Sequence, residues 1–151
     1  MSRVTGGRAQ PLSDQCMKIE YKINAPITTH EFIEVLRVSG LGERRPVEDM
    51  KCKGMIANSN LIASAWDGEA LVGIARAITD FYYACYLSDL AVSKSHQRLG
   101  IGKSLQSVLQ QQLGPKCKLI LLAAPAASSY YGALEYTSNP RGWVLERDVK
   151  I

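Results

Sequence analysis

The order of predicted elements indicates an α/β fold of the α+β type, in which helices flank a mixed central sheet. Three observations predict it. Segments that alternate apolar and polar residues, as half-buried strands do, precede and follow segments with the apolar spacing of helices. Asp67-Gly68 joins two β-rich runs, which predicts an antiparallel hairpin. Residues 118–122 form an apolar run typical of a strand that is buried on both faces.

The first half of the chain predicts one strand and two helices. Residues 18–23 alternate as a half-buried strand does. A helix capped by Thr28 or Thr29 follows and ends near Gly40. Pro46 begins a second helix, because proline fits the first helical position. The apolar face of this helix is formed by Met50, Met55 and Ile56.

The second half predicts the remaining strands and two more helices. The strands cover residues 60–66, 70–78, 82–92, 118–122 and, at the end of the fold, 142–147. Residues 101–113 repeat apolar side chains at helical spacing, and Gly114-Pro115 ends that helix. A short helix over residues 128–134 precedes the last strand.

Length and composition bound the class of protein. The 151 residues suffice for one domain with a substantial core. We expect residues 1–16 to be a flexible leader and residues 17–151 to be that domain. No run suits a signal peptide or a membrane span, and a net charge of +4 does not indicate nucleic-acid binding. Four scattered cysteines, without a C-x-x-C pair, and two histidines predict no zinc site and reduced thiols in the cytoplasm.

A strand, a glycine-containing loop and a helix start, over residues 86–105, form the most informative segment. Unpaired N–H groups and the helix dipole make such a helix entrance an anion site. A Rossmann loop would need a third glycine after Gly100 and Gly102, and a Walker loop would need glycine at Gln97. Both of these phosphate loops therefore lack a required residue. Nearby cations, Lys94, Arg98 and Lys103, suit a ligand with several phosphates, and Arg44-Arg45 with Lys51 and Lys53 forms a second basic cluster.

The loop Gln97-Arg98-Leu99-Gly100-Ile101-Gly102 resembles the Q/R-x-x-G-x-G/A loop of the GNAT superfamily of N-acetyltransferases. In that family the loop binds the pyrophosphate of acetyl-CoA, so the resemblance implies this role for residues 97–102 and for Lys103 and Ser104 after them. A turn without any ligand is the alternative. The preceding Leu90, Ala91 and Val92 resemble the strand whose main chain pairs with the pantetheine arm.

A second segment resembles the family's A-x-x-F-Y-x-x-L-G-F motif and covers residues 127–136. The resemblance implies that Tyr131 protonates the departing thiolate of coenzyme A, while Tyr130 is the better candidate for a packing role. Glu135 stands where the family has glycine, so we expect a differently made turn. Ala124 stands near the place of a frequent asparagine.

The general base and the acceptor are not identified by the sequence. Asp89 and Tyr86 are candidates for the base, on opposite faces of one strand, and water is the third. The segment 29–58 corresponds in place to the acceptor-shaping region of the family, although it is the least family-like part of the chain. Its carboxylates would attract a cationic amine if some of them line the cleft, whereas most such side chains are solvated helix charges. These carboxylates are Glu31, Glu34, Glu48 and Asp49.

Together these observations predict a cytoplasmic N-acetyltransferase of the GNAT fold, which transfers acetyl from acetyl-CoA to a primary amine without a metal. Its partner is a small-molecule or peptide amine, not a nucleic acid or a membrane, and dimers are common in the family. Two alternatives remain open at this point: a GNAT-fold module that binds acyl-CoA without turnover, and a nucleotide-binding Rossmann or P-loop protein.

Overall fold

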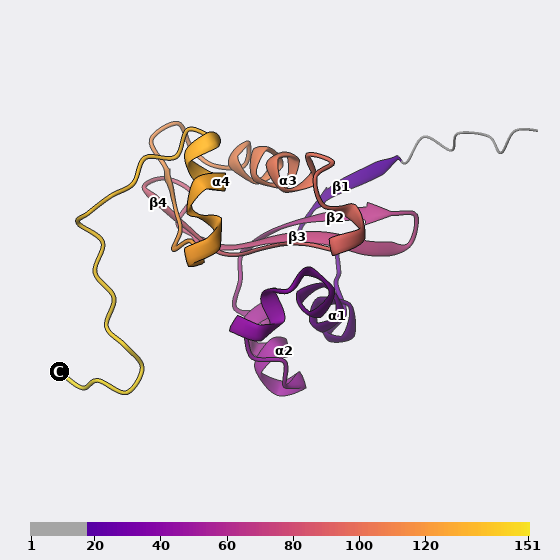
Figure 1. Ribbon diagram of the computed structural model, residues 1–151, viewed down its shortest axis with the longest axis horizontal. Helices are drawn as coiled ribbons and strands as arrows, with labels where there is room; N and C mark the ends of the chain where they lie inside the picture. Colours follow the sequence, from indigo (N-terminus) through magenta and orange to yellow (C-terminus); the bar gives the residue numbers. More distant parts are fainter. Residues whose placement is uncertain (1–17) are drawn as a thin grey trace, which may run out of the picture.

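The computed structural model describes residues 18–151 as a sheet with helices on both of its faces (Figure 1). The predicted leader, residues 1–16, lies outside the described part. The strands are β1 (Ile19–Ile23), β2 (Leu61–Asp67), β3 (Ala70–Thr79), β4 (Ala84–Val92) and β5 (Lys118–Ile120). The helices are α1 (Thr29–Ser39), α2 (Asp49–Ala57), α3 (Ile101–Gln110) and α4 (Ser128–Ala133), with the short 3₁₀ helices η1 (Leu41–Arg44), η2 (Lys94–His96) and η3 (Pro125–Ala127).

The sheet is mixed, as the sequence predicts. Its five strands follow one another in chain order from β1 to β5, with antiparallel pairs up to β4 and a parallel pair between β4 and β5. The predicted hairpin is present: Asp67 pairs with Ala70, and Gly68 adopts φ +60 in the turn. This left-handed backbone is the one that glycine adopts without strain.

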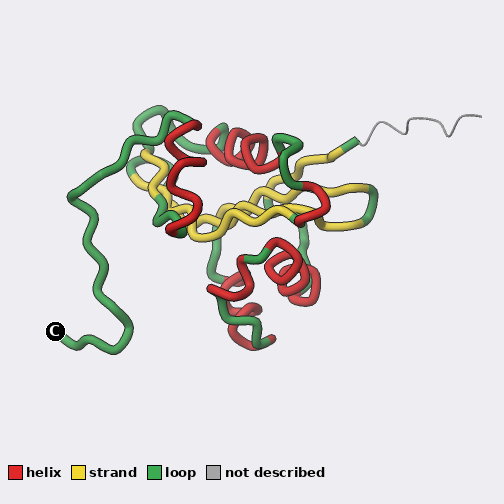
Figure 2. Tube along the Cα trace, viewed as in Figure 1, coloured by secondary structure: helices red, strands yellow, loops and turns green. Residues whose placement is uncertain are grey.

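Helices cover both faces of the sheet, with α1 and α2 on one side and α3 and α4 on the other (Figure 2). Each face of the sheet contributes to its own apolar cluster, because successive strand residues point to opposite faces. Leu105 and Leu109 of α3 lie in one cluster, and Phe32 and Leu36 of α1 lie in the other. The helical spacing of apolar residues over 101–113 therefore predicts the buried face of α3 correctly.

The predicted ends of α1 are confirmed. Thr28 caps the helix through a reciprocal capping box with Glu31, and Gly40 ends it with φ +87. The prediction for the next helix is partly wrong. α2 begins at Asp49 rather than at Pro46, and Met50 is 84% exposed, whereas Met55 and Ile56 pack against the core. The side chain of this helix that is fully buried is Cys52.

The two strands predicted nearest the C-terminus differ from the structure. The strand at residues 118–122 is only three residues long and lies at the edge of the sheet, so Ile120 and Leu122 are exposed rather than buried. Residues 142–147 form no strand, because their backbone finds no partner at the free edge of β5. Instead, residues 137–151 extend away from the sheet (Figure 1).

Candidate functional site

A helix entrance with free backbone donors lies directly after β4. Gly100 is the N-cap of α3, with φ +80, and no side chain caps the helix. The first hydrogen bond of α3 runs from the Ser104 N–H to the Gly100 carbonyl, 3.0 Å away. The N–H groups of residues 101–103 precede this bond, so they point out of the helix toward the loop. This entrance can bind an anion.

The side chains of the loop have distinct surroundings. Arg98, Lys103 and the neighbouring Lys94 are exposed, in keeping with a role beside phosphate groups. The Gln97 amide instead donates to the Val92 carbonyl, 2.9 Å away, and so fastens the loop to the end of β4. Ile101 is buried in the core, so only its backbone can meet a ligand.

The second glycine of the loop has a packing role that the sequence did not reveal. A Cβ atom on Gly102 would lie 2.8 Å from the Tyr130 hydroxyl. That hydroxyl accepts from the Gln106 amide, and Gln106 accepts from the Tyr136 hydroxyl at 2.8 Å. Gly102 therefore permits the close contact of α3 with α4. Tyr130, for which a buried packing role was expected, places its hydroxyl beside Gly102 but is 40% exposed.

A cavity of about 130 Å³ opens where β4 and β5 separate. The two strands pair only as far as Tyr86 and Ile120. Beyond Tyr86, the side of β4 that faces β5 has no strand partner within the described residues. The cavity is lined by Leu41, Arg44, Arg45, Leu87, Ser88, Leu90, Leu121, Leu122, Ala124, Ala127 and Tyr131.

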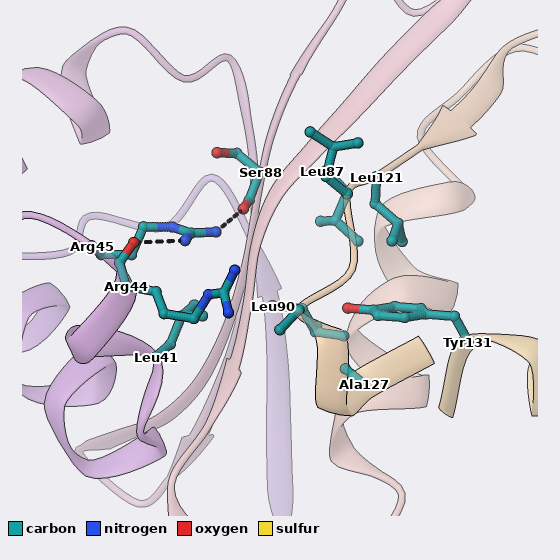
Figure 3. Close-up of a pocket in the computed structure, with 11 residues that line it drawn as sticks. Leu41, Arg44, Arg45, Leu87, Ser88, Leu90, Leu121, Ala127 and Tyr131 are labelled. Atoms are coloured by element: carbon teal, nitrogen blue, oxygen red, sulfur yellow. Dashed lines mark hydrogen bonds between the residues drawn. The ribbon is translucent and has the colours of Figure 1, made fainter. Parts of the chain in front are cut away.

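Two of the residues predicted for the site, Leu90 and Tyr131, line this cavity. The Tyr131 hydroxyl points into it toward Leu90 (Figure 3). The ring of Tyr131 is held edge-on by Tyr130 and Tyr136, with ring centroids 5.1 and 5.4 Å away. Burial raises the pKa of Tyr131 and Tyr130 acts in the same direction, while the charge of Arg45 lowers this pKa.

The other residues predicted for the site lie outside the cavity. Ala91 is buried in the cluster beneath α1, and Val92 borders the core on the side of α3. The loop residues from Gln97 to Ser104 lie past the end of β4. The structure thus separates the predicted phosphate loop from the cavity of Tyr131, and β4 connects the two.

Asp89 is not a free base. Its side chain is fully buried, and each carboxylate oxygen accepts from a guanidinium, one from Arg45 and the other from Arg76, both at 2.5 Å. Neither Asp89 nor Tyr86 lines the cavity. The structure therefore favours neither side chain as the base that accepts the proton of the amine.

None of the four acidic residues of segment 29–58 considered for the acceptor cleft lines this cavity. Glu31 closes the cap of α1, Glu34 pairs with Arg37 and Glu48 pairs with Lys51. Asp49 lies in the exposed first turn of α2. Arg44 and Arg45 take their place in the cavity wall, and the sequence offered only their membership of a basic cluster as a signal.

The turn after α4 also differs from expectation. Glu135 adopts φ +68, which is the left-handed backbone that glycine favours. Glu135 therefore adopts the same left-handed backbone that a glycine would adopt at this position, although it carries a side chain.

Within residues 18–151, no cluster of three or more potential metal ligands occurs. Over the same residues, no helix has the length and apolar character needed to cross a membrane.

The family model described as acetyltransferase (GNAT) domain matches residues 41–141, a span that holds the loop, the cavity and Tyr131. The chain belongs to the GNAT acetyltransferase family. It is 32% identical over 142 residues to the uncharacterized N-acetyltransferase ycf52 of Pyropia yezoensis, covering 87% of this chain and 80% of that protein. A ycf52-like uncharacterized N-acetyltransferase of Prochlorococcus marinus is 30% identical over 105 residues, covering 66% of this chain. The match spans only 57% of that relative's length.

Solved structures share the fold of this GNAT chain. A GNAT family acetyltransferase of Streptococcus pneumoniae superposes with a TM-score of 0.67 at 20% identity, covering 85% of this chain and 98% of that one. A ribosomal-protein-alanine N-acetyltransferase of Brucella melitensis gives a TM-score of 0.66 at 17% identity, covering 85% and 99%. At these identities, the likeness concerns the fold alone.

Proposed function

We propose that this GNAT acetyltransferase transfers the acetyl group of acetyl-CoA to a primary amine. One observation carries the proposal: the unpaired side of β4 connects an uncapped helix entrance with a cavity that contains the Tyr131 hydroxyl. A thioester bound along β4 would have its phosphates at one end of this strand and its reacting carbon at the other.

The donor is held mainly by main-chain groups. The N–H groups at the start of α3 suit the pyrophosphate, with Arg98, Lys103 and Lys94 nearby as counter-charges. The absence of a side chain at Gly100 fits this role, because within the described residues no atom outside its own stretch of chain lies within 4 Å of the position that its Cβ would take. The backbone of residues 90–92 is the proposed partner of the pantetheine amides, by the hydrogen bonding with which a strand recognises an extended ligand.

The reaction needs one bond made and one broken. The amine nitrogen attacks the thioester carbonyl carbon, a C–N bond forms, and the C–S bond breaks to release the thiolate of coenzyme A. We propose that the Tyr131 hydroxyl donates a proton to this thiolate. Because Asp89 is bound by two arginines, we assign water as the acceptor of the proton that the amine loses.

The pKa order limits how Tyr131 can act. A thiol has a pKa of about 8.5 and a phenol about 10, so complete transfer from phenol to thiolate is uphill by about 1.4 kcal/mol per unit of difference. Burial raises the pKa of Tyr131 further. The phenol must therefore regain a proton in the same turnover, and the proton released by the amine balances this step. The nearby charge of Arg45 favours the transient phenolate.

Release of thiol tests the proposal. The protein is mixed with acetyl-CoA and a panel of amines, and free coenzyme A is measured with a thiol reagent, with each acetylated product identified by its mass. Amine-dependent thiol release is the expected result. Tight binding of coenzyme A without release over a broad panel would contradict transfer and would favour a binding module instead.

A further inference from the structure

We infer that the acceptor carries a carboxylate near its amine and that Arg44 binds this carboxylate. The inference rests on the proposed function, because it assigns a ligand to the acceptor side of the same cavity. It reverses the sequence-based expectation of a cationic acceptor drawn to acidic side chains.

The cavity wall carries positive charge. Arg44 and Arg45 belong to the lining, and no aspartate or glutamate among residues 18–151 does. The neighbouring Glu43 lies on the same 3₁₀ helix but does not line the cavity. A cavity with positive walls attracts anions and repels a polycation, because charges interact more strongly near low-dielectric walls than in water.

The charge of Arg45 is only partly balanced by its neighbours. Its guanidinium donates to Asp89, to the Ser88 carbonyl at 2.7 Å and to the Arg44 carbonyl at 3.0 Å. The same Asp89 also pairs with Arg76. One carboxylate thus faces two guanidiniums, which leaves one positive charge at the cavity wall.

The hydrogen bonds of Arg45 also position its neighbour. They attach the end of η1 to β4 and fix the Arg44 backbone at the edge of the cavity. Arg45 is therefore a positioning residue, and Arg44 is the residue proposed to touch the ligand.

The orientation of the Arg44 side chain also suits a carboxylate ligand. Within residues 18–151, Arg44 has no acidic partner at ion-pair distance, and its guanidinium extends toward Leu90 from the side opposite Tyr131 (Figure 3). A guanidinium binds a carboxylate through two parallel hydrogen bonds. A carboxylate held there would leave an amine a few bonds away on the side of Leu90 and Tyr131. An amino acid has these two groups at such a distance, whereas a polyamine has no group for Arg44.

Matched acceptors test the inference. Thiol release is measured with free L-amino acids and with the corresponding amino acid amides, compared at equal concentrations of the neutral amine. For the amino acids that are the better acceptors, we expect kcat/KM to exceed that of their amides by about tenfold or more. A hydrogen bond to a charged group supplies a factor of this size. Arg44→Gln should bring the ratio close to one, and Arg44→Lys should leave an intermediate ratio.

The control variant is Arg37→Gln. It removes the same charge from an exposed position on α1, paired with Glu34 and outside the cavity. It should keep the ratio of the wild type. An equal loss in Arg37→Gln and Arg44→Gln would mean that overall charge causes the preference, and the inference would be wrong.

A binding measurement separates this inference from the proposed function. With the protein saturated by coenzyme A, N-acetyl amino acids should raise Tm more than their amides do, and Arg44→Gln should remove the difference. This result without any thiol release would support a carboxylate site and refute the transfer. Turnover with acids and amides alike would support the transfer and overturn the carboxylate site. If Arg44→Gln weakened coenzyme A binding and left the ratio of kcat/KM for acids and amides unchanged, Arg44 would contact coenzyme A. This result would also overturn the carboxylate site.

Discussion

At the scale of single residues, Tyr131 offers the sharpest test, because its ring and its hydroxyl have different partners. The ring is packed by Tyr130 and Tyr136, while the hydroxyl points into the cavity. Tyr131→Phe should keep the packing and lower kcat about a hundredfold or more, as expected for the loss of a general acid. Coenzyme A binding, measured as a shift in Tm, should barely change.

Tyr83→Phe is the control for this measurement, because Tyr83 is exposed and lies outside the cavity. It should keep the activity of the wild type. Undiminished turnover in Tyr131→Phe would make Tyr131 a packing residue and leave the thiolate to take its proton from water.

Asp89 is expected to act on stability rather than on chemistry. Asp89→Asn removes the charge that two buried or half-buried guanidiniums share. Breaking a buried ion pair in this way costs about 3–5 kcal/mol, and the partial exposure of Arg45 favours the lower end. We therefore expect a large fall in Tm by calorimetry. At a temperature where the variant is still folded, the pH dependence of kcat should match that of the wild type. Loss of a titration step from this profile would restore Asp89 as a base.

Single residues differ in how far the sequence predicts their contacts. The positions of Gly100 and Tyr131 follow from local motifs, because a loop or a short helix fixes their neighbours in the chain. The pair of Arg45 with Asp89 joins residues 44 positions apart, and no periodicity predicts such a contact. The cationic wall of the cavity could therefore be found only in the folded chain.

At the scale of elements, the entrance of α3 can be tested by its backbone. Gly100→Val places a branched side chain at φ +80 and crowds the N–H groups that we propose for the pyrophosphate. We expect the rise in Tm on adding coenzyme A to disappear. Gly68→Val is the matched control, because Gly68 has φ +60 and also has open space around it, but lies in the β2–β3 hairpin.

Gly68→Val should lose stability from backbone strain and still respond to coenzyme A. A response that persists in folded Gly100→Val, or vanishes equally in both variants, would argue against a phosphate site at the start of α3.

The turn after α4 predicts a stabilising substitution. Glu135 holds a left-handed backbone, which costs a residue with a side chain about 1–2 kcal/mol. Glu135→Gly removes this strain but gives the unfolded chain more freedom, which offsets about 0.4–1 kcal/mol. We expect a net rise in the free energy of unfolding, measured by urea denaturation. A decrease would mean that the side chain of Glu135 stabilises the turn by more than its backbone strain costs.

The sequence predicts the length of a helix or strand where a turn or a cap marks its end, and not elsewhere. The β2–β3 hairpin has an Asp-Gly turn, and α1 has a cap at each end, so their limits follow from local chemistry. The apolar residues after Lys118 carry no sign that one edge of their strand is free. These residues would be buried only if another strand paired with the free edge of β5, and the described chain provides no such strand.

At the scale of the whole molecule, the match to the GNAT family model covers residues 41–141. The chain from residue 137 onward nevertheless lies away from the sheet. Apolar side chains are exposed on this segment, at Trp143, Val144 and Leu145, and the edge of β5 exposes Ile120 and Leu122. Within residues 18–151, nothing covers either surface in one copy of the chain. A homodimer built on either of them would bury these side chains.

The two tryptophans report which state exists in solution. Trp143 is 94% exposed, whereas Trp66 is 8% exposed and donates its indole N–H to the Ser64 hydroxyl. We expect a fluorescence component that iodide quenches readily and that disappears in Trp143→Phe, which leaves the blue-shifted emission of Trp66. Quenching should not vary with protein concentration, because no other segment of the described chain covers Trp143. Protection of Trp143 that increases with concentration, together with a larger mass by light scattering, would contradict this expectation and identify the segment 137–151 as an interface between two copies.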